Sequence, residues 1–159
     1  MNISQLSAWV QQMTRLGEAD IPYTSVDGRR LTPRQILQAA QSDPILWAKI
    51  QAVMGDPMYC PACGYQTPDM TVSACPQCGG RMTPVGMTLE PDLLKERFRK
   101  RVEEGRVPVV HRMHDGEVAA MTPEEQMREV ERGTLEGQAI LLAEAKLMEE
   151  LERRRLAGG

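Results

Sequence analysis

The sequence predicts a mostly α protein with a small β metal module between two helical arms, and three observations support this fold class. The four cysteines of the chain all fall within residues 60–78. Apolar residues recur at helical spacing before and after this cluster. Residues 58–90 are rich in Pro and Gly and poor in charge, a pattern typical of turns and short strands. We therefore expect an N-terminal helical region (1–57), a metal module (58–90) and a charged C-terminal helical region (91–159).

The N-terminal region is expected to form three helices. Ser4 can cap the first one. The apolar stripe of that helix comprises Leu6, Trp9, Val10 and Met13. Residues 21–26 are expected to be extended and to close in a turn at Asp27–Gly28. Two further helices begin at Thr32–Pro33 and Asp43–Pro44, where a capping side chain precedes a proline at the first helical position.

The first half of the C-terminal region is expected to hold a helix and a hairpin. Pro91 opens the helix and Gly105 ends it. Residues 107–121 contain the turn sequence His114–Asp115–Gly116–Glu117 between two short apolar runs. A turn of this kind between apolar runs predicts a short β-hairpin.

The second half of the C-terminal region is expected to be one long helical stretch. It starts at Thr122–Pro123 and continues to about Leu156. A bend is expected near Gly133 and Gly137, because each glycine costs a helix about 1 kcal/mol relative to alanine. An apolar stripe runs along it through Ile140, Ala143, Leu147 and Leu151. This stripe either packs within the chain or contacts a partner.

The chemistry of the sequence lies in two Cys-x-x-Cys pairs separated by 11 residues. Each pair lets two sulfurs face one ion across a tight turn, and the glycine after each pair permits a positive φ. Clustered pairs of this kind favour a metal in a reducing compartment over disulfides. The predicted ligands are Cys60, Cys63, Cys75 and Cys78, and their four sulfurs would form a closed tetrahedral site for zinc or iron.

Residues 59–80 resemble the zinc-ribbon family, and they also resemble the rubredoxin-like domain of rubrerythrins. The second resemblance rests on Cys63–Gly64–Tyr65 and on Cys75–Pro76–Gln77–Cys78–Gly79. It implies redox iron, but rubrerythrins pair this domain with a di-iron bundle that uses Glu-x-x-His motifs. Neither His111 nor His114 follows a glutamate by three residues. We therefore expect one structural Zn²⁺ and keep iron as the alternative.

Charge does not favour nucleic acid as the main partner. The net charge is −3, and Asp69, Arg81 and Glu90 are the charged residues of the metal module. Phosphate contacts need Lys and Arg. The basic cluster from Lys95 to Arg101 is interpreted as a solvated helix face, with phosphate binding as the alternative. The methionines of the metal module fit a protein-contact surface better. They are Met58, Met70, Met82 and Met87.

The sequence predicts a cytoplasmic protein without catalytic activity. It has no apolar run of about 18 residues and no basic start followed by an apolar stretch, so neither a membrane span nor a secretory signal is expected. It shows no Ser/His/Asp triad and no Gly-rich phosphate loop. A site with four cysteine ligands leaves no position for a reactive water.

These features predict a non-enzymatic structural or adaptor protein, stabilised by zinc, that docks into a larger protein assembly such as a viral or phage particle. Metal binding would supply folding free energy of order 10 kcal/mol where aromatic residues are few. Two alternatives remain open at this point. One is a nucleic-acid-associated zinc-ribbon regulator, and the other is an electron-transfer protein that resembles rubredoxin and holds iron.

Overall fold

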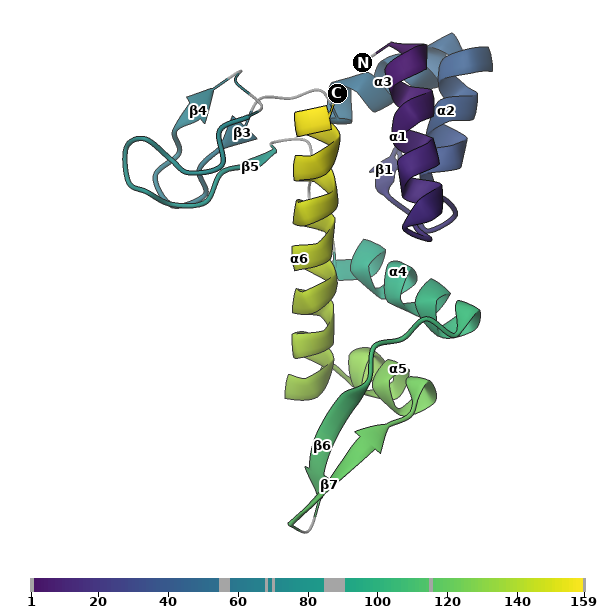
Figure 1. The fold of residues 1–159 in the computed structure, drawn as a ribbon, viewed down its shortest axis with the longest axis vertical. Coiled ribbons are helices and arrows are strands. Elements are labelled where there is room, and N and C mark those ends of the chain that lie inside the picture. The colour runs from purple at the N-terminus through teal and green to yellow at the C-terminus, as the bar shows by residue number, and fades with distance from the viewer. Residues whose placement is uncertain are drawn as a thin grey trace. The chain divides into compact units, whose positions relative to one another are not determined.

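The structure is a computed structural model that describes residues 2–54, 58–67, 69, 71–84, 91–114 and 116–158. The chain divides into two compact units. One comprises Met1–Thr88 together with Met148–Gly159, and the other comprises Leu89–Leu147. The described residues are mostly helical and include three small antiparallel sheets (Figure 1). This confirms the helical fold class that the sequence predicts.

The N-terminal part of the first unit holds three helices and one two-stranded sheet. In chain order these are α1 (Ile3–Arg15), β1 (Thr24–Val26), β2 (Arg29–Leu31), α2 (Pro33–Ser42) and α3 (Pro44–Met54). Strands β1 and β2 pair antiparallel with Val26 opposite Arg29, so the turn lies at Asp27–Gly28 as expected. Both residues of the turn have positive φ.

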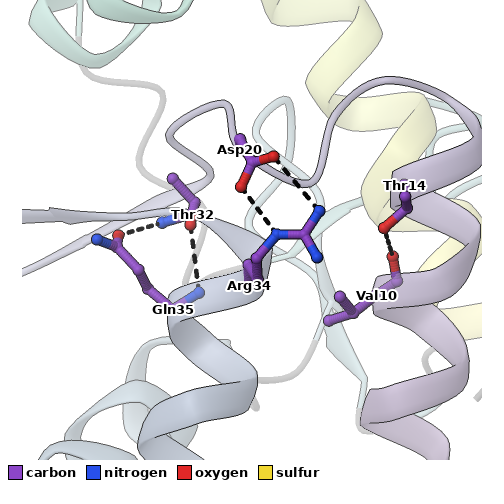
Figure 2. Close-up of polar contacts among 6 residues, drawn as sticks. All are labelled: Val10, Thr14, Asp20, Thr32, Arg34 and Gln35. Atoms are coloured by element: carbon purple, nitrogen blue, oxygen red, sulfur yellow. Dashed lines mark hydrogen bonds and ion pairs between the residues drawn. The ribbon is translucent and has the colours of Figure 1, made fainter.

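Side chains at the helix starts explain the boundaries of α1 and α2. The cap of α1 is Asn2, not Ser4 as predicted. Asn2 Oδ1 accepts from the Gln5 amide at 2.8 Å, while Gln5 Oε1 accepts from the Asn2 amide at 3.0 Å. A capping box needs a side chain three residues ahead that bonds back to the cap residue. Asn2 has such a partner in Gln5, and Ser4 has none. Thr32 and Gln35 form the same capping box at α2, as Figure 2 shows.

The core of this part confirms the predicted apolar stripe of α1. Leu6, Trp9, Val10 and Met13 are all buried. Trp9 meets Tyr23 edge-on, with ring centroids 5.1 Å apart. Away from the core, the Arg34 guanidinium faces the Asp20 carboxylate, and Arg34 Nε lies 2.9 Å from Asp20 Oδ1 (Figure 2).

The metal module contributes a three-stranded antiparallel sheet to the first unit, with strand order β4–β3–β5 (Figure 1). Its strands are β3 (Met58–Tyr59), β4 (Gln66–Thr67) and β5 (Thr83–Pro84). Met58 and Met82 are buried here with Cys60 and Cys75. These two methionines therefore fill the core of the module, and the expectation that they form a contact surface is wrong. Met70 and Met87 lie outside the described residues.

The second unit contains α4 (Pro91–Glu104), the hairpin β6 (Val110–His114) and β7 (Glu117–Met121), and α5 (Pro123–Arg132). The hairpin confirms the prediction for residues 107–121, and Met113 pairs with Val118 near its tip. Asp115, in the expected turn, lies outside the described residues. Helix α6 (Leu135–Gly158) begins in this unit and supplies its last residues to the first unit.

The expected single bent helix after Thr122 is two helices. Gly133 adopts φ +68° and caps the C-terminus of α5, and α6 begins two residues later. Gly137 lies within α6, where a Cβ atom would fall 2.1 Å from the carbonyl oxygen of Glu129. The glycine is therefore required by the close approach of the two backbones.

The basic cluster of α4 is not a uniformly solvated face. Arg97 is fully buried and Arg101 is 8% exposed. Arg97 Nε lies 2.9 Å from Glu144 Oε1, and Arg101 Nε lies 2.9 Å from Glu144 Oε2. Residues four positions apart share one face of a helix. This face of α4 packs on α6, which corrects the interpretation for these two arginines.

Candidate metal centre

Two short backbone loops position the four cysteines. In the first, the Cys60 amide donates to the Tyr65 carbonyl and the Gly64 amide donates to the Cys60 carbonyl, both at 2.8 Å. The second repeats this pattern. The Cys75 amide donates to the Gly80 carbonyl at 2.7 Å, and the Gly79 amide donates to the Cys75 carbonyl at 2.8 Å. The two cysteine pairs therefore lie in two separate tight turns that have the same hydrogen-bond pattern.

Glycine is needed after each pair because the backbone there is left-handed. Gly64 has φ +80° and Gly79 has φ +73°, as the glycine after each cysteine pair predicts. Gly80 serves a different purpose, which the sequence did not indicate. A Cβ atom at Gly80 would lie 3.1 Å from Cys78 Sγ and 3.2 Å from Cys60 Sγ. The absence of a side chain at this position leaves room for the sulfur cluster.

The structure brings all four predicted ligands together. Their sulfur atoms lie within 4.8 Å of one another. Cys60 Sγ is 3.5 Å from Cys78 Sγ, and Cys63 Sγ is 3.5 Å from Cys75 Sγ. Zinc–sulfur bonds of about 2.3 Å in a tetrahedron place sulfurs about 3.8 Å apart. All four cysteines are free thiols. The arrangement therefore fits a single tetrahedral ion.

The thiols of the cluster differ in acidity. Burial disfavours the Cys75 thiolate, but N–H groups of Cys78 and Gln77 outweigh it and lower the pKa of Cys75 to about 7. The Tyr65 N–H favours the Cys63 thiolate, yet hydrogen bonding with Cys75 and burial prevail and raise the pKa of Cys63 to about 12. Because a metal ion binds cysteines as thiolates, metal uptake would release protons.

The donor set decides what an ion could do at this centre. Four sulfurs complete a tetrahedral shell, which leaves no open position for a water or substrate. Sulfur ligands in this geometry suit zinc or iron. Within the described residues, this is the one cluster of metal-binding side chains. The chemistry of the centre is therefore structural with zinc, or electron transfer with iron.

Contacts from α6 reach the metal module, and no pattern in the sequence indicates them. Arg153 donates a hydrogen bond to the carbonyl oxygen of Met82. Arg81 Nη1 lies 3.1 Å from Glu149 Oε2. The partners are about 70 residues apart in the chain, so no local pattern links them. These contacts connect the end of α6 to the two residues that precede β5.

The last turns of α6 also bind the N-terminal part of the unit through a buried charge group. Glu152 is fully buried and accepts hydrogen bonds from Tyr23 and Arg155. Arg155 also donates to the Met54 carbonyl at 2.9 Å. Burial opposes the Arg155 charge, but its bond to Glu152 outweighs that effect and raises the pKa of Arg155. No local pattern in the sequence indicates this role of Arg155.

No protein-family model, curated protein or solved structure matches this chain at a significant level. The fold and the site therefore define its class by themselves: a mostly helical protein with a four-cysteine candidate metal centre. In the part of the chain that the structure describes, no helix has the length and apolar character needed to cross a membrane.

Proposed function

We propose that this protein is a non-enzymatic structural or adaptor protein that uses one structural Zn²⁺ and docks into a larger protein assembly. The observation that carries the proposal is the closed set of four sulfur ligands, Cys60, Cys63, Cys75 and Cys78. Such a site stabilises a fold and leaves no position for a reactant. The resemblance of residues 59–80 to zinc ribbons agrees with this role.

The connection between the metal module and α6 supports a structural role for the ion. Arg153 and Glu149 of α6 bond to residues that directly follow the second cysteine pair. Glu152, on the same turns of α6, bonds to Tyr23 beside β1, and Arg155 bonds to Met54 at the end of α3. A metal that fixes residues 58–84 would therefore also order the elements that meet at the end of α6.

Exposed apolar side chains support docking on protein. Val109, Met113 and Val118 are each at least 65% exposed, and they lie at or beside the β6–β7 hairpin. An isolated two-stranded hairpin is marginally stable in water. Exposed apolar side chains on such an element are typical of surfaces that bind another protein. A large assembly of many copies, such as a viral or phage particle, would use a protein of this kind.

A nucleic-acid-associated regulator is the second candidate, and the buried arginines weaken it. Arg97 and Arg101, two of the five basic residues from Lys95 to Arg101, are bonded to Glu144 and withdrawn from solvent. Arg99 and Lys100 remain on the surface beside glutamates. If this role holds, charge reversal at Arg99 and Lys100 abolishes binding, and the affinity falls steeply with salt.

Native mass spectrometry of untagged protein from its own cells tests the proposal. A mass that includes one zinc ion and a protein complex supports the structural role. A lone monomer that contains iron and absorbs visible light would instead establish the electron-transfer alternative. A complex that dissociates on nuclease treatment would establish the regulator.

A further inference from the structure

The sulfurs of the candidate metal centre form two close contacts between the loops that carry them. Cys60 Sγ lies 3.5 Å from Cys78 Sγ, and Cys63 Sγ lies 3.5 Å from Cys75 Sγ. Each contact is a hydrogen bond in which either sulfur can donate, and it joins the first loop to the second. The two sulfurs of a contact would approach by only about 1.5 Å to reach the length of a disulfide bond.

Each contact joins an accessible cysteine to an inaccessible one. Cys63 and Cys78 are exposed, whereas Cys60 and Cys75 are buried. Oxidation starts at a solvent-accessible cysteine, and it ends in a disulfide where a second cysteine lies next to the first. Each exposed cysteine of this centre therefore has a buried cysteine in position to complete a disulfide.

Disulfides within the loops are the alternative, and they would add little to loops that are already closed. The Gly64 amide donates to the Cys60 carbonyl, and the Gly79 amide donates to the Cys75 carbonyl. The contacts between the loops instead join residues that are 18 and 12 positions apart. A disulfide that closes a longer segment restricts the unfolded chain more. Bonds between the loops are therefore favoured.

Bonds between the loops would also take over the mechanical role of the ion. Cys60 and Cys75 are buried in the core of the metal module with Met58 and Met82. The Met82 carbonyl accepts the hydrogen bond from Arg153 of α6. Because a metal binds thiolates, formation of the disulfides removes its ligands. The same disulfides keep the two loops joined, so this core stays closed after the ion has left.

We propose that the four cysteines form a switch that responds to hydrogen peroxide, in which the disulfides Cys63–Cys75 and Cys60–Cys78 replace the metal ion. This inference rests on the proposed zinc site and adds regulation to it.

The chemistry of the switch consumes one peroxide for each disulfide. The Cys63 sulfur attacks one peroxide oxygen, the O–O bond breaks, and a sulfenic acid and one water form. The Cys75 sulfur then attacks the sulfenic sulfur, which forms the S–S bond and releases the second water. Cys78 and Cys60 react with a second peroxide in the same way. In the metal-bound form the cysteines are thiolates, so the four protons that complete the waters come from solvent.

Treatment of the zinc-loaded full chain with a small excess of hydrogen peroxide tests the proposal. A chromogenic chelator compares the zinc released with that from an untreated sample. Mass spectrometry maps the disulfides after free thiols are blocked and the chain is cleaved at Asp69, which lies between the two cysteine pairs. We expect loss of the zinc and two joined peptides that fragmentation assigns to Cys63–Cys75 and Cys60–Cys78. Retained zinc, any other pairing, or sulfinic acids in place of disulfides would overturn the proposal.

Hydrogen exchange tests whether the disulfides replace the ion. Residues 58–84 should exchange more slowly in the oxidised, zinc-free protein than in reduced protein from which a chelator has removed the zinc. Reduction with dithiothreitol should restore zinc binding. Equal exchange in the two zinc-free forms, or failure to rebind zinc after reduction, would contradict a switch.

Single variants test each pair separately. Cys63→Ser should form only the Cys60–Cys78 bond, and Cys78→Ser should form only the Cys63–Cys75 bond. A Cys60–Cys75 bond in either variant contradicts the pairing. Each variant also loses a metal ligand, so the wild-type map decides if they fail to fold, and Ser73→Ala is the control that should react as wild type does. Zinc in the untreated protein without disulfides after peroxide overturns this inference alone, whereas absence of zinc from protein purified from its own cells removes the proposed function.

Discussion

Arg153 of α6 donates a hydrogen bond to the backbone carbonyl of Met82, 71 residues earlier in the chain. Met82 belongs to the buried core of the metal module, together with Cys60 and Cys75. The bond therefore connects the surroundings of the candidate ion to the last turns of the longest helix. It provides a direct path by which loss of the ion would loosen α6.

We predict that this connection makes α6 sensitive to the metal. Removing the ion with a chelator should speed amide hydrogen exchange in residues 148–155 as well as in residues 58–84. Arg153→Met should speed exchange at the end of α6 even with metal bound, because it removes the bond to Met82. The matched control is Arg154→Met, since Arg154 is half exposed and pairs with Glu150 on its own helix. Unchanged exchange in residues 148–155 after chelation would contradict this coupling.

We predict that Cys75→Ser removes the ion and destabilises the metal module. Serine oxygen is a poor replacement for a thiolate in a site of four sulfurs. Metal analysis should show less than one ion per chain, and the melting temperature should fall by about 2–4 °C for each kcal/mol lost. The control is Ser73→Ala, because Ser73 is exposed and close in sequence. Full metal content with unchanged melting in the Cys75 variant would refute the ligand assignment.

We predict that Glu144→Gln is strongly destabilising. The substitution removes the negative charge that Glu144 places beside the buried Arg97 and Arg101. Loss of one member of a buried ion pair typically costs about 3–5 kcal/mol. Denaturant unfolding should show this loss, while Glu150→Gln at the exposed Arg154 pair should change stability by less than about 0.5 kcal/mol. Equal effects for the two variants would show that the buried group does not stabilise the unit.

We predict that the stability lost in Glu144→Gln depends on pH. Burial favours the neutral form of Glu144, but its bonds with Arg101 and the charge of Arg97 prevail and lower the pKa of Glu144 from 4.5. A lowered folded-state pKa gives stability that is present above the ordinary value and lost as pH falls through the folded value. The gap in unfolding free energy between wild type and Glu144→Gln should therefore be full above pH 4.5 and shrink below it. A gap that stays constant through acid would exclude ionisation as its origin.

We predict that Gly137→Ala destabilises α6, although alanine normally favours a helix by about 1 kcal/mol. The new Cβ atom would lie 2.1 Å from the Glu129 carbonyl oxygen, so the backbones of α5 and α6 must separate. Ala139→Gly is the control, because Ala139 is exposed and should lose only the helix propensity. Thermal unfolding measures both. A more stable Gly137→Ala protein would show that the two helices do not approach closely in solution.

The sequence by itself determined the features that depend on short spacing. The two cysteine pairs, the capping box at Thr32 and the hairpin at residues 110–121 each depend on residues a few positions apart. Such elements depend on local hydrogen bonds and φ preferences, and these can be predicted from the residue types alone. The exception is the cap of α1. Asn2 caps this helix in place of Ser4, because the Gln5 side chain also accepts a hydrogen bond from the Asn2 amide.

Only the tertiary structure decided which charged side chains are buried and which distant residues they bond to. Arg97 and Arg101 look like a solvated face in sequence, yet both bond to Glu144, more than 40 residues away. Tyr23 and Glu152 meet across 129 residues. A charged side chain is buried only when a distant partner compensates its lost hydration, and no local pattern specifies that partner. For the same reason, the sequence did not predict the contact of Arg153 with the metal module or the need for glycine at position 137, since both depend on segments that are distant in the chain or pack only in the folded protein.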